Sequence, residues 1–467
     1  MLQFIEKKSE LDQSNLVVFI ENKSDLSVLE NYKFSDEMLK KCKEWVKNDK
    51  NFCYDFFVWS AKTEKIIVLF YSKKSDITAI DFFWEHFPKL DNELVLATLS
   101  EKFLIDFIDT AILSRYEFDK YKEKKSEKKL SFIWTESQKE QILERLPTVE
   151  NICLARDLWN MPACDLTPEN FAKIIKKTKW KNTKVRILSP KDIEKKWLGL
   201  LHWVWKWSAN KPHMAILERI VDKKSETYGF VWKWIVFDTG WLDIKTQMMY
   251  EMKDDMCWAS QTFCIMKELD RVKNLNVNVI AAIPLAENSV SSTSYRPSDI
   301  LTSYSWKTVN ITNTDAEWRL VMADAVSYLS KNYEIQHMST IATLTGVALF
   351  ALWFRYAAVM WTNSKFINHM VKQSAEAPEK YCEFPFDKYY MDECKSTIAD
   401  FDNHSKGPYC GSIMGWAFMA NFLENNESYT HFDIAGVANN TYKPFGRNPV
   451  TSTWVGVESI SNYIKSL

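Results

Sequence analysis

The stretch FVWKWIVFDTGWLDIK, residues 230–245, indicates which kind of fold this chain adopts. Its first half is almost entirely apolar, which is typical of a strand buried on both faces of a parallel sheet. We predict further strands of the buried type at three places, 184–189, 277–285 and 307–312. Because longer amphipathic segments separate these strands, we expect residues 150–467 to form an α/β domain with a central mixed, largely parallel sheet flanked by helices.

The first third of the chain predicts a separate, small α/β domain at residues 1–140. The apolar runs 15–20 and 65–71 are typical of strands. The segment 93–116 carries apolar residues at helical spacing, so we expect one or two helices there. We place the domain boundary between about 130 and 150, because buried-type strands begin to alternate with longer helices only after it.

Composition limits the classes of function. Lys and Arg total 60 and Asp and Glu total 61, so the net charge of -1 gives no support for binding to nucleic acid or an anionic membrane. The Lys-rich segment 118–132 is interleaved with Glu, which indicates a solvated hairpin or linker. The nine scattered cysteines contain no C-x-x-C pair, which is typical of reduced thiols in a cytoplasmic protein. We expect no signal peptide, because the first residues carry acidic side chains and no apolar core segment. We expect no membrane span, because no uncharged apolar run reaches ~20 residues.

Charged side chains follow two of the predicted strands. They are Lys233, Asp238, Lys245 and Asp255 in the first segment, and Asp315, Glu317 and Arg319 in ITNTDAEWRL (311–320). Taken singly, each has an ordinary structural role, since Asp often caps a helix and Thr314 and Glu317 fit a capping box. Together they lie at the carboxyl ends of strands, where open α/β sheets bind ligands. Several carboxylates at one site repel each other unless a cation holds them, so the sequence predicts a divalent-metal site.

These segments resemble the leucine (cytosol) aminopeptidase family of dinuclear metallopeptidases. NTDAEWRL resembles the family signature NTDAEGRL, and VWKWIVFDTGWLDIK resembles the family pattern GKGIxFDTGGLxIK. Further matching blocks lie at 155–172, 283–301, 342–346 and 431–436. The resemblance covers residues 150–467, whereas the N-terminal third matches only loosely.

The resemblance implies an aminopeptidase that hydrolyses the N-terminal residue, often leucine or another apolar residue, from peptides. It implies two divalent cations, Mn²⁺ or Zn²⁺, that activate a water molecule. The implied metal ligands are Lys233, Asp238, Asp255, Asp315 and Glu317. Lys245 would stabilise the oxyanion, and Arg319 would hold a bicarbonate ion that carries the proton.

The resemblance also implies a substrate pocket and an assembly. The side chain of the substrate would contact Met252, Thr343, Leu344 and Gly346. From the residues alone, core packing explains Met252 equally well. Relatives in this family imply a cytoplasmic homo-hexamer, in which the domain 1–140 would serve oligomerisation or regulation.

Glycine is scarce and tryptophan abundant in this chain, with 10 and 20 residues respectively. Family blocks have glycine where this chain has Trp203, Trp205, Trp207, Trp232, Trp234, Trp241, Trp258, Trp318 and Trp454. Glycine would also be unsurprising at Trp197, Trp306, Trp353, Trp361 and Trp416. Overpacking costs ~1–3 kcal/mol per site and a domain is stable by only ~5–15 kcal/mol, so many such replacements would prevent folding.

Two hypotheses explain these tryptophans. In the first, UGA codons that the host reads as glycine have been translated as tryptophan, and the living protein has glycine at positions such as Trp232, Trp234, Trp241 and Trp318. In the second, the tryptophans are genuine and the chain is a non-catalytic oligomeric scaffold or a DNA-binding regulator. The first hypothesis is compatible with an active aminopeptidase, because the tryptophans replace glycines and spare the expected metal ligands.

Overall fold

The computed structural model divides the chain into two compact units, one reaching to Cys153 and the other comprising most of the chain from Leu154 onward. Each unit is described by itself. The described residues are 2–5, 15–21, 36–47, 51–57, 65–71, 79–90, 93–98, 100–125, 128–133, 135–206, 208–247, 249–250, 252, 257–292, 295–342, 346–362, 364–373, 379–404, 407, 409–440, 451–453 and 455–467.

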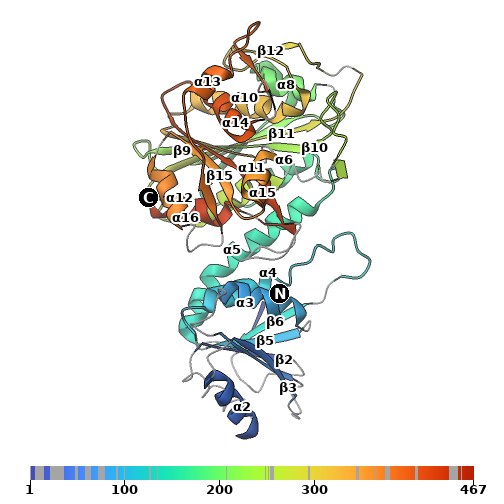
Figure 1. The fold of residues 1–467 in the computed structure, drawn as a ribbon. Coiled ribbons are helices and arrows are strands. Elements are labelled where there is room, and N and C mark those ends of the chain that lie inside the picture. Colours follow the sequence, from blue (N-terminus) through green and yellow to red (C-terminus); the bar gives the residue numbers. More distant parts are fainter. Residues whose placement is uncertain are drawn as a thin grey trace. The chain divides into compact units, whose positions relative to one another are not determined.

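The described residues of the first unit form a six-stranded sheet with the order β1-β6-β5-β2-β4-β3 (Figure 1). The strands are β1 (Leu2–Ile5), β2 (Asn15–Ile20), β3 (Phe52–Phe57), β4 (Lys65–Phe70), β5 (Glu93–Thr98) and β6 (Lys129–Ile133). The β3·β4 pair is antiparallel and the other pairs are parallel. The helices are α2 (Asp36–Lys47), α3 (Ala79–His86), η3 (Phe87–Lys89), α4 (Leu104–Leu113) and α5 (Glu136–Asn160), which continues beyond Cys153.

The expectation of helix throughout 93–116 is wrong for its first part, because Glu93–Thr98 forms the inner strand β5. Leu94 packs into one apolar cluster, and the next residue, Val95, packs into a second cluster. A strand buried on both faces is apolar at nearly every position, so it also contains residues at helical spacing. The expected linker 118–132 is likewise wrong at its end, where the last residues belong to β6.

The described residues of the second unit form a nine-stranded mixed sheet with a parallel centre (Figure 1). The strand order is β16-β15-β18-β14-β9-β11-β8-β7, and β10 pairs with β11 beside this path. The strands are β7 (Lys184–Leu188), β8 (His213–Arg219), β9 (Thr227–Trp232), β10 (Trp234–Asp238), β11 (Asn278–Asn288), β14 (His337–Ala342), β15 (Ala357–Trp361), β16 (Tyr381–Glu383) and β18 (Ser428–Asp433). The central pairs β11·β9, β9·β14 and β14·β18 are parallel. The α/β fold class expected from the sequence is confirmed.

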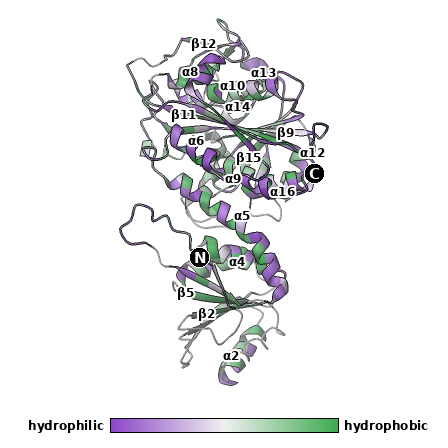
Figure 2. Cartoon of the chain, turned by 180° about the vertical axis from the view of Figure 1, so that it is seen from behind, coloured by the Kyte–Doolittle hydropathy of each residue, from purple (hydrophilic) through white to green (hydrophobic). Residues whose placement is uncertain are grey.

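Helices cover both faces of this sheet (Figure 1). On one face lie α8 (Gly199–Trp205), α10 (Glu317–Asn332), α13 (Tyr389–Glu393) and α14 (Gly411–Ala420). On the other lie α6 (Pro168–Lys177), α9 (Cys257–Arg271), α12 (Ser364–Gln373) and α16 (Val457–Ser466) (Figure 2). Shorter helices are α7 (Pro190–Lys195), α11 (Gly346–Leu352) and α15 (Ala435–Ala438). Figure 2 shows hydrophobic residues along the central strands, as expected for strands covered on both faces. Within the part of the chain that the structure describes, no helix has the length and apolarity to span a membrane.

Two expected strands differ in detail from the structure. The apolar run 230–238 is divided at Lys233 into β9 and β10, and β11 continues beside both parts. The run 307–312 forms β13 (Thr308–Asn310) in a separate three-stranded sheet with β12 (Ile300–Thr302) and β17 (Phe401–Asp402). Val309 is the one buried residue of this short strand, which is too little apolar surface for a place in the main sheet. A further two-stranded ribbon pairs β19 (Asn439–Asn440) with β20 (Thr451–Ser452).

Several tryptophans occupy backbone conformations that suit glycine. Among the described residues, six non-glycine residues have a positive φ, and four of them are Trp197 (58°), Trp241 (60°), Trp306 (69°) and Trp353 (58°). A left-handed conformation costs an L-residue roughly 1–2 kcal/mol, whereas glycine adopts it freely. The backbone at these four positions therefore has the conformation that glycine would adopt.

Other tryptophans are buried without a partner for the indole N–H. Trp232, Trp234, Trp241 and Trp416 are 0% exposed, and within the described chain their Nε1 atoms have no hydrogen-bond partner. Each such donor costs ~1–3 kcal/mol. The ring centroid of Trp234 is 3.7 Å from that of Phe171, whereas aromatic pairs are usually separated by roughly 4.5–7 Å. These contacts indicate an overfilled interior.

Candidate metal centre

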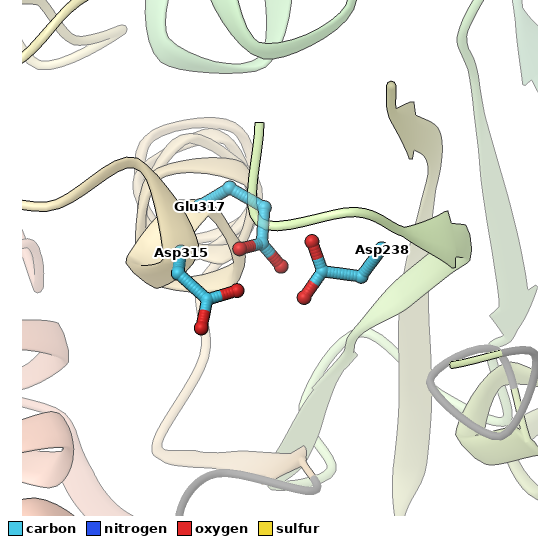
Figure 3. Close-up of side chains that lie close together, drawn as sticks. All are labelled: Asp238, Asp315 and Glu317. Atoms are coloured by element: carbon cyan, nitrogen blue, oxygen red, sulfur yellow. The ribbon is translucent and has the colours of Figure 1, made fainter. Parts of the chain in front are cut away.

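Three carboxylates from two distant stretches of the chain converge in the second unit (Figure 3). Asp238 is the last residue of β10, Asp315 lies in the 3-10 helix η5 (Thr314–Ala316), and Glu317 is the first residue of α10. One oxygen from each carboxylate lies within 4.8 Å of the other two. Asp238 and Glu317 are buried and Asp315 is half-buried, so little water reaches this group. The structure thus brings together three of the residues expected to bind metal.

Two turns that carry these carboxylates are bonded to each other. The Thr314 hydroxyl donates to the carbonyl oxygen of Gly240 at 2.8 Å, and the Thr314 N–H donates to the Asp243 carboxylate at 2.7 Å. Gly240 has a φ of 76°, and a Cβ there would lie 2.4 Å from the carbonyl oxygen of Asp243 and 3.0 Å from Oδ1 of Asp315. This close approach requires glycine at position 240.

The capping box expected from Thr314 and Glu317 is not formed. Thr314 uses its hydroxyl in the contact with Gly240, and Asn313 instead caps η5 by accepting the N–H of Asp315 at 2.6 Å. The N-cap position of α10, Ala316, has no side-chain cap. The Glu317 carboxylate is therefore not engaged in capping and faces the other carboxylates (Figure 3).

Asn288, the last residue of β11, orients the carboxylate of Asp238. Its Nδ2 donates to Oδ1 of Asp238 at 2.6 Å, and the backbone N–H of Gly240 donates to the same oxygen at 2.9 Å. The other oxygen, Oδ2, is 3.0 Å from Nζ of Lys245. Both oxygens of Asp238 are thus held in fixed directions.

Two lysines lie against the carboxylates. Lys233, in the gap between β9 and β10, is 2% exposed, and its Nζ is 3.3 Å from Oε1 of Glu317. The Nζ of Lys245 contacts both Asp238 and Asp315. The break in the strand at Lys233 therefore coincides with a buried ion pair at the site.

Burial and the neighbouring Asp238 make the Asp315 carboxylate costly to keep ionised. Burial raises the pKa of Asp315, the nearby Asp238 raises it further, and Lys245 opposes the rise. A divalent cation would remove this repulsion, because it favours the charged form of every carboxylate around it. The donor set therefore fits a metal ion.

Arg319 is buried in the first turn of α10. Its Nη1 donates to the backbone carbonyl of Asn403 at 3.0 Å, and its guanidinium carbon is 4.8 Å from the ring centroid of Trp318. Burial lowers the pKa of Arg319 to about 10, so the side chain stays cationic at neutral pH. Its buried Nε has no hydrogen-bond partner among the described residues. A buried cationic donor without a partner is suited to an anion.

The remaining expected site residues are only partly described. Met252 is half-buried, and Gly346 is the first residue of α11. Asp255, Thr343 and Leu344 lie outside the described residues. The fifth metal ligand and the side-chain pocket therefore stay predictions.

The structure adds residues that sequence reasoning did not single out, namely Asp243, Asn288, Tyr295 and Asn403. The Tyr295 hydroxyl donates to the carbonyl oxygen of Thr314 at 3.0 Å, which supports the same turn from another side. Asn288 and Tyr295 belong to the matching block 283–301 and Asp243 to the matching segment 231–245, and this membership is the signal that the sequence offers. The partners of Asp243 and Asn403 depend on which turns meet in space, so no local pattern indicates them.

Comparison with known proteins identifies the family. The model of a family described as "Cytosol aminopeptidase family, catalytic domain" matches residues 153–460. The chain belongs to this family. It is a metal-dependent aminopeptidase, a metallo-exopeptidase of the leucyl aminopeptidase type.

Individual members of the cytosol aminopeptidase family align over most of the chain. A "Probable cytosol aminopeptidase" of Cenarchaeum symbiosum (strain A) is 33% identical over 368 residues, covering 77% of this chain and 75% of the relative. One of Wolbachia pipientis wMel is 35% identical over 342 residues, covering 70% and 68%. The crystal structure of cytosol aminopeptidase from Coxiella burnetii has a TM-score of 0.81 at 24% identity, covering 100% and 99%. The bottromycin maturation enzyme BotP in complex with Mn has a TM-score of 0.81 at 22% identity, covering 97% and 99%. These two structural likenesses concern the fold alone.

Proposed function

We propose that this aminopeptidase uses two divalent cations to remove the N-terminal residue, often leucine or another apolar residue, from peptides. The convergence of Asp238, Asp315 and Glu317 within 4.8 Å carries this proposal. Lys233 and Asp255 would complete the ligand set, with carboxylates shared between the cations. Oxygen ligands combined with one amine suit Mn²⁺ and Zn²⁺.

The cations and two lysines would have distinct roles in the reaction. When bound, the cations supply an activated water and polarise the scissile carbonyl. Lys245 pairs with two carboxylates, which favours its charged form, and it would donate to the oxygen that becomes negative during attack. Lys233 would serve as a neutral amine, so metal binding has to displace its proton.

Arg319 would hold a bicarbonate ion that accepts a proton from the attacking water and passes it to the departing amine. Its guanidinium is cationic, and its buried Nε has no partner in the part of the chain that the structure describes. A guanidinium binds a planar oxyanion through two parallel hydrogen bonds. This arrangement would place an acceptor for the proton beside the carboxylates.

We also propose a substrate pocket, a cellular location and an assembly for this aminopeptidase. Met252, Thr343, Leu344 and Gly346 would contact the side chain of the first substrate residue. The protein would act in the cytoplasm as a homo-hexamer, and residues 1–140 would serve its oligomerisation or regulation. Analytical ultracentrifugation of the full chain tests the assembly: a sixfold mass supports the hexamer, and a monomer contradicts it.

The tryptophans decide between this function and a non-catalytic one. Trp232 and Trp234 flank Lys233, and Trp241 follows Gly240 in the turn after the strand. Genuine tryptophans at these positions would favour an inactive oligomeric scaffold or a DNA-binding regulator. The positive φ of four tryptophans supports glycine instead, as do buried indole N–H groups that lack partners among the described residues. We therefore propose that the living protein has glycine at these positions and is active.

Expression of the chain with glycine at the fourteen tryptophan positions, nine where glycine is expected and five where it would be unsurprising, tests the activity. The expected result is Mn²⁺-dependent release of leucine from a chromogenic amide. A chain that folds and binds metal but shows no turnover would contradict the peptidase. Mass spectrometry of peptides from the native protein tests the glycines separately, because intact tryptophan at positions 232, 234 and 318 would contradict them.

A further inference from the structure

Asn403, which follows β17, is fully buried and bonded to both sides of the segment that leads into α10. Its Oδ1 accepts the backbone N–H groups of Thr312 at 2.8 Å and Asn313 at 3.2 Å, and its Nδ2 donates to the carbonyl oxygen of Asn313 at 2.6 Å. Its backbone carbonyl accepts from Nη1 of Arg319 at 3.0 Å. Asn403 is thus hydrogen-bonded to residues on both sides of the turn that carries Asp315 and Glu317.

We propose that Asn403 is a positioning residue of the metal centre, which fixes the backbone at 312–313 so that Asp315 and Glu317 keep their places. This inference rests on the proposed function, because it concerns the same site. Asp315 follows Asn313 by two residues, so a rotation of the backbone at Asn313 would displace its carboxylate. The side chain of Asn313 accepts the N–H of Asp315 at 2.6 Å, which extends the series of bonds from Asn403 to a ligand.

The amide group is the feature that this position requires. It presents one acceptor and one donor in a plane, and both are used on the same short segment. Asp at position 403 would keep the acceptor and lose the donor to Asn313. Ala would leave the N–H of Thr312 and the N–H and carbonyl of Asn313 without these partners. Because buried backbone groups rarely stay unpaired, the turn would rearrange.

A purely structural link between β13 and β17 is the alternative role, and the chain offers a matched control for it. One residue before Asn403, Oδ1 of Asp402 accepts from Nδ2 of Asn310 at 2.7 Å, and these two residues are paired in the register of the two strands. This pair links the same strands but precedes the turn that carries the carboxylates. Asp402→Ala therefore loosens the small sheet without removing a bond to 312–313.

Two measurements on the metal-free, glycine-restored full chain test the inference. Calorimetric titration with Mn²⁺ gives the metal affinity, and thermal unfolding gives the midpoint of the metal-free protein. We expect Asn403→Ala to weaken Mn²⁺ binding by about 10–100-fold, the range found when groups behind metal ligands are removed. Asn403→Asp should weaken it less, because the acceptor is retained. Asp402→Ala should lower the thermal midpoint and keep the Mn²⁺ affinity of the parent chain.

Unchanged Mn²⁺ affinity in a folded Asn403→Ala chain would overturn the inference, and so would an equal loss of affinity in Asp402→Ala. If Asn403→Ala does not fold, Asn403→Asp decides: weaker Mn²⁺ binding supports the inference and parent-like binding overturns it. A parent chain that binds no Mn²⁺ would contradict the metal centre itself. Parent-like binding in the Asn403 variants contradicts only the positioning role.

Discussion

Asp238 in the carboxylate cluster and Trp241 beside it differ in how well their polar groups are satisfied. Asp238 accepts hydrogen bonds from Asn288 and Gly240 and pairs with Lys245. Trp241, three residues further along, is fully buried at a φ of 60°, and among the described residues its indole N–H has no partner. Buried polar groups in native proteins are nearly always paired, and bulky residues rarely adopt a positive φ. The Asp238 side chain therefore suits this fold, whereas the Trp241 indole does not.

Among the substitutions, removal of one carboxylate from the cluster should have the largest effect on metal binding and activity. Asp315→Asn keeps the shape of the side chain and removes one negative charge from the cluster. Because loss of groups behind metal ligands already costs about 10–100-fold, loss of a ligand should lower Mn²⁺ affinity by more than about 100-fold. Leucine release should fall with it, as a chromogenic assay would measure.

Asp400→Asn is the control for this variant, because Asp400 is bonded to Thr308 outside the cluster. It should keep both metal affinity and activity. Parent-like activity in Asp315→Asn would exclude this residue from the ligand set.

Lys245→Met separates the catalytic charge from the metal ligands within the same cluster. The variant removes the ammonium that contacts Asp238 and Asp315. Loss of a preorganised donor to an oxyanion typically costs about 10²–10³-fold in kcat, so we expect that decrease with unchanged metal content. Steady-state kinetics and metal analysis measure the two quantities. Metal loss that parallels the loss of kcat would assign Lys245 a structural role instead.

Trp241→Gly tests whether an indole belongs at position 241. The deciding observation is whether the substitution raises or lowers the free energy of unfolding. If glycine belongs at 241, removal of the indole from a chain with glycine at the other thirteen positions should raise the free energy of unfolding by ~1–3 kcal/mol, the usual cost of overpacking. Trp84→Gly, in the buried part of α3 where no glycine is expected, should lower it by ~3–5 kcal/mol. Urea unfolding of both variants measures these changes. An equally large loss at position 241 would show that the indole belongs to the native core.

Trp306→Gly should give the smallest effect, because the side chain is 68% exposed and only the backbone is strained. Relief of the positive φ should raise the free energy of unfolding by about 1–2 kcal/mol. Trp306→Ala keeps a Cβ, so it should leave the strain in place and show little gain. Thermal unfolding of the two variants separates these effects, and equal stability would argue against strain at this position.

Sequence patterns located the strands and the carboxylates of the site because these features are local. The apolar run 230–238 ends at Asp238, and NTDAEWRL at 313–320 contains two carboxylates within three residues. The division of that run at Lys233 could not be predicted, because it arises from the pairing of β10 with β11 and from the contact with Glu317. The residue pattern of a segment indicates which of its side chains can be buried. It does not indicate which other segments pack against it.

The same limit explains the errors in the first unit. Glu93–Thr98 is apolar on both faces, and its pattern fits a helix as well as an inner strand. Only the neighbours β2 and β6 decide between them. The orienting role of Asn288 and the contacts of Asn403 are hidden for a related reason, since each bond joins residues about 50 to 90 positions apart.

The metal content of the protein purified from cells that make it naturally shows whether the carboxylate cluster holds divalent cations. Elemental analysis by mass spectrometry, with the chain concentration from amino-acid analysis, gives the number of divalent ions per chain. The proposed two-cation centre, of which Asp238, Asp315 and Glu317 form the described part, predicts two ions per chain. Their removal by a chelator should abolish leucine release until Mn²⁺ or Zn²⁺ is restored. An active enzyme that contains no divalent metal would contradict the account.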